Sequence, residues 1–273
     1  MSQQIKVFNK NKLDLTYTNA SISVTDATAT YDGSDIVNYL RNRNNYSAWA
    51  TTNSNDAANT TLVCNFGDVV SLTDIILVKH NLKSYTIKYW DGSAYQDFST
   101  AISETINTET TTFHSFDQVN TERIQIIITG TMTANDDKIL RQLIATSKVL
   151  TGQLQGWPEI KKPTHTTGKR INTMLSGKIN VVETLSSFSM QLSVKNWNID
   201  ADLSIVEQFY FGRRGFLISI SGGDEDQFSH KRIGYRKEDI YLMRAVDDYE
   251  PEWNSFVYKN GIKLSISLRE SIN

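Results

Sequence analysis

Two acidic clusters in the C-terminal half have the clearest capacity for chemistry. They are residues 224–226 (Asp-Glu-Asp) and residues 247–250 (Asp-Asp-Tyr-Glu). Two carboxyl groups on either side of a glycosidic bond can act as general acid and as base or nucleophile, so these clusters could in principle hydrolyse a sugar. Both lie in polar, turn-like stretches, however, where carboxylates are ordinarily solvated. We therefore expect a protein without enzymatic activity.

Metal and cofactor chemistry finds little support in the sequence. The four histidines and the single cysteine do not have the spacing typical of a metal site. Cys64 lies within an apolar run and is expected to be a small core residue. Asp26, Asp32 and Asp35 could offer oxygen ligands to calcium, but their spacing fits no standard loop. We expect no metal and no cofactor.

The composition limits the class of protein further. A chain of 273 residues with 39% hydrophobic content can form one large or two ordinary domains. The formal net charge of -2 lacks the basic excess that nucleic-acid binding usually requires. The N-terminal residues have no apolar signal segment, and the longest apolar runs are too short to span a bilayer. We expect synthesis in a cytoplasm, no nucleic-acid partner and no membrane insertion.

The elements that must position any site are short and strand-like. In the first half they are rich in β-branched residues, and residues 85–90 alternate at period two, with Tyr85, Ile87 and Tyr89 on one face. Asp91-Gly92 predicts a turn after that segment. A short turn of helix is expected from Ile36 to Arg41. The other predicted strands of this half are residues 13–17, 21–24, 61–66, 73–78 and 123–128.

A change in amino-acid composition near residue 151 predicts a domain boundary. Residues 151–170 contain two of the three prolines and are expected to form a linker or arm. Asp202 to Phe211 is the single predicted helix, with Asp202 as N-cap and Gly212 as its stop. The predicted strands of this half are residues 178–182, 187–194, 215–221, 240–246, 255–258 and 263–268. The expected architecture is all-β, with domains at residues 1–150 and 171–273.

The first half resembles the discoidin, or F5/8 type C, family of galactose-binding-like domains over roughly residues 10–150. The resemblance rests on an ordered series of segments: Ser47-Ala48-Trp49, Leu62 to Gly67, Ile75 to Asn81, Tyr85 to Tyr95, Ile124 to Ile128 and Ile139 to Ala145. Two departures are that Asn65-Phe66 replaces the usual acidic-Leu pair, and that Gln142 stands where the family has a glutamate. The resemblance implies an eight-stranded jelly-roll β-sandwich.

The same resemblance implies that loops at one end of the sandwich could bind sugars or lipids. The loops are residues 26–35, 42–59 and 79–84. Aromatic rings there could stack on sugars, and polar side chains could bind hydroxyl groups. Trp49 fits the core better than a ligand platform, and His80-Asn81 also fits a simple turn. The candidate ligand-binding residues are Tyr31, Arg41, Arg43, Tyr46, His80 and Lys83.

The whole chain resembles tail or baseplate proteins of bacteriophages, of the distal tail type. The segment Gly152 to Pro158 carries this resemblance, together with the strand, helix and strand pattern from Phe188 to Ile220. It implies a second β-sandwich or barrel domain with one short helix. It also implies a virion structural protein that forms a ring with further copies of itself, a hexamer for example, and contacts other tail proteins.

Charged stretches could support such assembly, because opposite charges on adjacent loops suit contacts between neighbouring subunits. A solvated surface hairpin is the other interpretation of the same stretches. The candidate interface residues are Trp157, Asp224, Asp226, Arg232 and Arg236. The alternative function is adhesion to a host or cell-surface glycan.

Overall fold

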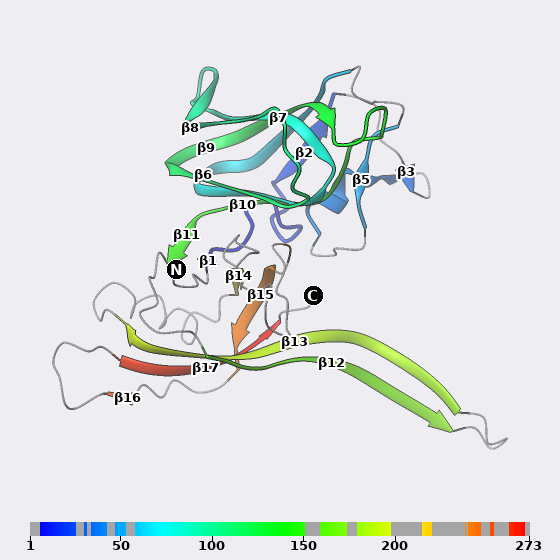
Figure 1. Cartoon of the computed structure of the whole chain (residues 1–273), viewed down its shortest axis with the longest axis vertical. Helices are drawn as coiled ribbons and strands as arrows, with labels where there is room; N and C mark the ends of the chain where they lie inside the picture. Colours follow the sequence, from blue (N-terminus) through cyan, green and yellow to red (C-terminus); the bar gives the residue numbers. More distant parts are fainter. Residues whose placement is uncertain are drawn as a thin grey trace. The chain divides into compact units, whose positions relative to one another are not determined.

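The computed structural model describes residues 6–25, 30–31, 34–42, 47–52, 58–150, 159–173, 179–197, 215–219, 238, 240–246, 252–253 and 262–270. The chain divides into two compact units. The core unit comprises Asn9–Lys148 with Arg236–Glu238, and the ribbon unit comprises Met1–Phe8, Val149–Tyr235 and Asp239–Asn273. Antiparallel strands dominate both units (Figure 1), which confirms the predicted all-β class.

The core unit is built around one seven-stranded antiparallel sheet. Its order is β5-β10-β6-β9-β7-β8, and β2 pairs with β6 beside this path. A 3-10 helix at Ile36–Leu40 agrees with the predicted helical turn. The strands are β2 (Ser21–Val24), β5 (Trp49–Ala50), β6 (Thr60–His80), β7 (Leu82–Trp90), β8 (Tyr95–Glu104), β9 (Thr112–Thr131) and β10 (Ile139–Thr146), and a small separate pair is formed by β3 (Thr30–Tyr31) and β4 (Ser34–Asp35).

Strand β6 joins two segments that were predicted as separate strands, residues 61–66 and 73–78. Its first part pairs with β2 and its last part with β10, while β9 pairs along its other edge. Register shifts interrupt the β6–β9 pairing after Asn65 and after Leu72. Gly67, with φ of 84°, supplies the left-handed backbone that the first irregularity needs. The polar stretch between the two apolar runs is thus a bulge rather than a loop.

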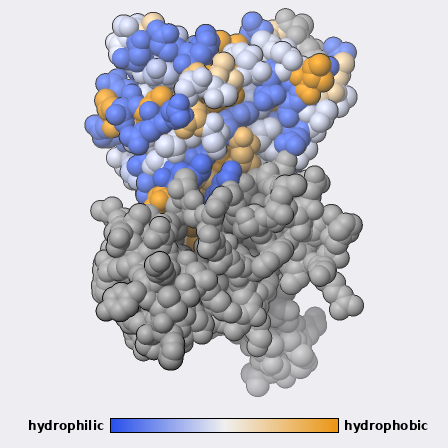
Figure 2. All heavy atoms as spheres, turned by 60° about the vertical axis from the view of Figure 1, so that its left-hand side comes forward, coloured by the Kyte–Doolittle hydropathy of each residue, from blue (hydrophilic) through white to orange (hydrophobic). Residues whose placement is uncertain are grey.

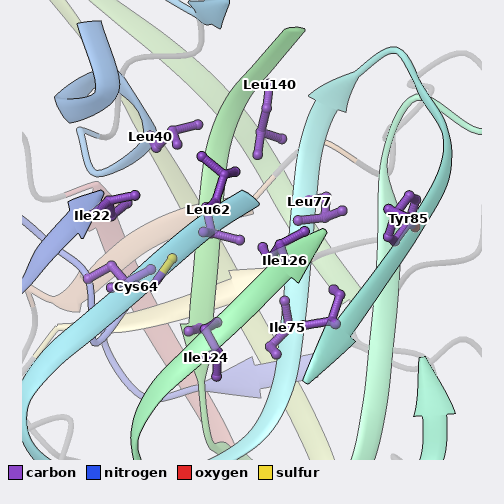
Figure 3. Close-up of a cluster of buried hydrophobic side chains, with 14 of the residues drawn as sticks. Ile22, Leu40, Leu62, Cys64, Ile75, Leu77, Tyr85, Ile124, Ile126 and Leu140 are labelled. Atoms are coloured by element: carbon purple, nitrogen blue, oxygen red, sulfur yellow. The ribbon is translucent and has the colours of Figure 1, made fainter. Parts of the chain in front are cut away.

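The hydrophobic core of this unit is formed by side chains from one face of each strand, because side chains alternate between the two faces of a strand. Leu62 and Cys64 from the first part of β6 face the same cluster as Ile75 and Leu77 from its last part. Figure 3 shows these side chains gathered with Ile124 and Ile126 of β9 and with Leu140 of β10. Trp49 and Cys64 are fully buried, as predicted, and burial raises the pKa of the Cys64 thiol to about 12.

The ribbon unit contains an eight-stranded sheet with the order β11-β1-β14-β15-β17-β13-β12, and β16 pairs with β17. Strands β12 and β13 form a long two-stranded ribbon (Figure 1). The predicted helix at Asp202 to Phe211 lies outside the described residues. The strands are β1 (Lys6–Phe8), β11 (Lys148–Leu150), β12 (Glu159–Thr173), β13 (Ile179–Trp197), β14 (Phe216–Ser219), β15 (Ile240–Ala245), β16 (Glu252–Trp253) and β17 (Ile262–Glu270).

Two features of this unit differ from the predicted boundaries. Residues 159–170, expected as part of a linker, lie in β12, because pairing with β13 satisfies their backbone and Pro163 falls at a register shift. The N-terminal strand β1 belongs to this unit and not to the first domain, because Val7 and Phe8 pair with Ile218 and Leu217. Among the described residues, no helix is long and apolar enough to cross a membrane.

Candidate binding face on strands β7, β8 and β9

Two of the predicted ligand-binding residues, Arg41 and His80, form hydrogen bonds inside the core unit. Arg41 is buried; its Nε donates to the carbonyl oxygen of Leu13 at 2.8 Å, and its Nη2 donates to that of Tyr17 at 2.9 Å. It therefore holds the turn between these residues. His80 is also buried, and its Nδ1 accepts a hydrogen bond from the backbone N–H of Leu82 at 3.1 Å. Both arrangements favour structural roles.

The remaining predicted residues are placed differently. Lys83 is exposed on β7, and Tyr31 lies in β3 with its side chain outside the description. The other predicted ligand and interface residues lie outside the described residues: Arg43, Tyr46, Trp157, Asp224, Asp226, Arg232 and Arg236. Their roles stay predictions.

A buried polar network surrounds His80. The Tyr85 hydroxyl donates to Thr112 Oγ1 at 3.0 Å and lies 2.9 Å from His114 Nε2, while His80 Nε2 lies 3.2 Å from Thr112 Oγ1. Desolvation lowers the pKa of both histidines from 6.5 to about 4, and for His80 the charge of His114 adds to the effect. Both imidazoles are therefore neutral near pH 7.

The outward face of the same strands has a different character. On β7, Tyr85 and Ile87 face the core, so Lys88 and Trp90 face outward. On β9, Ile124 and Ile126 face the core, so Arg123 and Gln125 face outward. The register pairs Lys88 with Gln125 and with Asp97, and Trp90 with Tyr95. Polar and aromatic side chains from three strands thus meet on one face.

The centre of this face is an aromatic–arginine platform, which we define as Trp90, Tyr95 and Arg123. The Arg123 guanidinium carbon lies 5.5 Å from the centroid of the Trp90 ring, a cation–π arrangement. The Trp90 and Tyr95 rings meet edge to face, with centroids 5.1 Å apart and planes at 66°. All three residues are partly exposed. They can touch a ligand without any rearrangement of the core.

Backbone contacts hold the platform in place. Thr121, itself buried, accepts hydrogen bonds at Oγ1 from the backbone N–H groups of Trp90 and Arg123, both at 3.2 Å. The same hydroxyl donates to the Trp90 carbonyl oxygen at 2.7 Å. One threonine therefore fixes the relative position of two strands at the platform.

The turn beside the platform is equally well supported. Asp91 Oδ1 accepts hydrogen bonds from the backbone N–H groups of Ser93 and Ala94, both at 2.8 Å, and Oδ2 accepts one from the Gln96 side chain. These bonds favour the carboxylate and hold its pKa well below its usual range. The predicted Asp91-Gly92 turn is confirmed, and it fixes Tyr95 against Trp90.

Hydrogen-bonding capacity remains at the platform. The Arg123 side chain is 42% exposed, and its Nη2 lies 3.8 Å from the adjacent Glu122 carboxylate. Its Nε is buried, with no hydrogen-bond partner among the described residues. Lys88, which is partly exposed, and the exposed Asp97 form an ion pair at 3.2 Å beside the platform. The side of the core unit seen in Figure 2 is mainly hydrophilic, with scattered hydrophobic residues. This chemistry suits a polar ligand with some apolar surface.

Among the described residues, no group of three or more His, Cys, Asp or Glu side chains is arranged to hold a metal ion. The platform itself was not among the predicted ligand-binding residues. A signal for it existed, because the alternation of residues 85–90 places Trp90 on the polar face, where a large aromatic side chain has no core to fill.

No family model matches the sequence, and no curated protein matches it. Solved structures similar to part of the chain include the GH29 fucosidase of Ruminococcus gnavus in complex with fucose, at 14% identity over 51% of this chain and 27% of the fucosidase, with a TM-score of 0.40. The chain thus spans about a quarter of the length of that enzyme.

Two smaller proteins are similar over nearly their whole length. One is chitosan-binding module 1 of a chitosanase/glucanase from Paenibacillus sp. IK-5, at 13% identity over 50% of this chain and 98% of the module, with a TM-score of 0.40. The other is the family 32 carbohydrate-binding module of Clostridium perfringens NanJ in complex with galactose, at 16% identity over 53% of this chain and 100% of the module, with a TM-score of 0.40.

Proposed function

We propose that the core unit is a non-enzymatic, galactose-binding-like module that recognises a host or cell-surface glycan on the aromatic–arginine platform. The observation that carries this proposal is the partly exposed pair of Trp90 and Arg123, clamped together on the outward face of β7 and β9 by Thr121. Trp90 lies on the polar, outward face, and the buried Thr121 holds its backbone, so its ring is available for ligand contact.

Saccharide chemistry matches these side chains. The C–H faces of a sugar ring stack on the aromatic rings, and its hydroxyl or carboxylate oxygens accept hydrogen bonds from the guanidinium group. The Arg123 side chain is 42% exposed, so the exposed N–H groups of its guanidinium can donate to ligand oxygens. Because the platform is already ordered by the Asp91 turn and by Thr121, little conformational entropy is lost on binding.

A glycan array followed by titration calorimetry on the best ligand tests this proposal. We expect Trp90→Ala to weaken binding about tenfold or more, since the loss of an aromatic contact residue commonly costs at least about 1.4 kcal/mol. Arg123→Ala should weaken binding as well, most strongly for acidic sugars. Lys83→Ala is the matched control, because Lys83 is exposed on the same strand but belongs to the loop residues predicted from the sequence.

The three variants separate two possible positions for the ligand. Loss of affinity in Trp90→Ala with normal binding in Lys83→Ala places the glycan on the platform. The reverse result would move the site to the loop end of the unit, and an array with no binding at all would remove the glycan function.

A second candidate function is structural: a component of a bacteriophage tail or baseplate that forms a ring with copies of itself and contacts other tail proteins. The observation that favours an assembly role is the β12–β13 ribbon, which continues past the end of its pairing with β17 (Figure 1). Light scattering on the purified chain, followed by electron cryo-microscopy of the native assembly, tests this function. A closed ring or density in a tail would support it, and a strict monomer at high concentration would contradict it.

A further inference from the structure

Part of the β12–β13 ribbon pairs with no other described strand. The two strands pair from Glu159 with Ser193 to Thr173 with Ile179. On its other edge β13 pairs with β17 only from Ser189 to Trp197. Among the described strands, none pairs with the outer edge of β12, and none with β13 from Ile179 to Phe188. Figure 1 shows this part of the ribbon extending beyond β17.

A two-stranded ribbon of this kind needs support from elsewhere. An isolated pair of strands is marginally stable in water, and three or more strands with a packed face are required for independent stability. Among the described strands, the far part of the ribbon, from His165 with Phe188 to Thr173 with Ile179, has only the pairing between its own two strands. An additional strand on one of its edges would supply what is missing.

The two edges are not equally suited to receive a strand. The sequence of β12 carries the residue types that protect exposed edges, namely several basic residues, a proline and a glycine. They are Lys161, Lys162, Pro163, Gly168, Lys169 and Arg170. By contrast, residues 179–188 of β13 contain one charged residue, Glu183, and neither proline nor glycine. This segment has the composition of a strand that pairs.

We propose that residues 179–188 of β13 pair antiparallel with the same residues of a second copy of this chain, which joins two ribbons into a four-stranded sheet. The proposal goes beyond the saccharide-binding function and does not depend on it. A second copy fits because one two-fold contact gives both ribbons the extra strands that each requires, and two-fold contacts are the commonest in homo-oligomers. Pairing through β12 would instead bring like charges together across the new contact.

The test compares charge substitutions at two positions that are register partners across the ribbon. Val181 lies on the free part of β13, and Ile171 is its partner on β12. We expect the full-length wild-type chain to be a dimer, or a higher even-numbered assembly, by light scattering. Val181→Lys should shift the population toward the monomer at least about tenfold, because a lysine on an exposed strand edge opposes pairing with another chain. Ile171→Lys should retain the wild-type mass.

A second measurement needs no variant. Hydrogen exchange of peptides from residues 179–188 should slow as the concentration of the wild-type chain rises, while peptides from β12 change less. A wild-type chain that is monomeric at the highest concentration reached would overturn the proposal. Equal dissociation of the Val181→Lys and Ile171→Lys variants would also overturn it, and so would exchange in residues 179–188 that does not depend on concentration. Glycan binding by the same samples reports separately on the core unit.

Discussion

Strands β6 and β13 have similar lengths, 21 and 19 residues, but different surroundings. Strand β6 has partners on both edges, with β9 along one edge and with β2 and then β10 on the other. Strand β13 has β12 on one edge, but β17 reaches only its last part. Strand β6 therefore lies inside the sheet of the core unit. Part of β13, by contrast, has β12 as its single partner among the described strands.

Residue types alone therefore do not decide which partner strands stabilise a long strand. Both strands are rich in Val and Leu. In β6, the side chains of Leu62, Cys64, Ile75 and Leu77 converge on one buried cluster, so its pairing is stabilised from within the unit. Residues 179–188 of β13 pair with β12 and with no other described strand, so we expect the ribbon's support to come from another copy.

Acid is the strongest expected way to weaken one region selectively. The folded-state pKa of His80 and of His114 is about 4, against 6.5 for an unperturbed histidine. Between these values the unfolded chain binds protons that the folded core unit does not, so stability is complete above about pH 6.5 and falls as the pH drops toward 4. The expected loss approaches about 3 kcal/mol for each histidine, at about 1.4 kcal/mol for each pKa unit.

Urea denaturation at several pH values measures this loss. The matched variant is His114→Gln, which removes one titrating group and should make stability depend less on pH in this range. A wild-type chain whose unfolding midpoint is constant from pH 7 to pH 4.5 would show that these histidines are not desolvated. The predicted loss of core-unit stability in acid would then be wrong.

The next largest effect should come from the core contact that β6 makes with β9. Ile126 is fully buried in the cluster, and its neighbour Ile127 is partly exposed on the outward face of the same strand. Ile126→Ala should destabilise the core unit by about 2–5 kcal/mol, and Ile127→Ala by less than about 1 kcal/mol. Thermal unfolding of the two variants checks this difference. Equal losses would mean that the two faces of β9 are not distinct.

Much of the fold could be predicted from the sequence, because β-branched composition and period-two alternation identify strands from local residues. Most of the β-branched segments, the alternation of residues 85–90 and the Asp91-Gly92 turn predicted elements that the structure contains. The strand predicted at residues 13–17 was wrong, because the backbone N–H groups of Asp14 and Tyr17 bond to carbonyl groups three residues earlier and form turns. The merging of residues 61–66 and 73–78 into β6 was not predicted, because continuous pairing with β9 depends on residues about fifty positions away along the chain. The strand at residues 159–170 was missed because Pro163 and Gly168 are typical of linkers.

The candidate site was less predictable than the fold. Arg41 and His80 have residue types that suit ligand binding, but their burial and their bonds to the backbone give them structural roles. Trp90 could have been selected from its outward position on a strand. Its meeting with Arg123 depends on the register between β7 and β9, which local pattern does not show. Residue type therefore identifies candidates, and register decides which of them meet.

The smallest predicted effect concerns the bulge that lets β6 continue from one set of partners to the next. A Cβ added at Gly67 would lie 2.5 Å from Asn19 Cβ and 2.9 Å from its carbonyl oxygen, and φ at this position is +84°. Gly67→Ala should therefore cost about 2 kcal/mol, from backbone strain together with a contact that the Asn19 backbone must yield to. Gly92→Ala is the control, because φ there is +106° but no atom lies within 4 Å, so only strain of about 1 kcal/mol remains. The measurement is the shift in thermal unfolding, with hydrogen exchange of β6 peptides. If the two variants lose equal stability, close packing at Asn19 does not shape the bulge, and β6 owes its continuous pairing to backbone conformation alone.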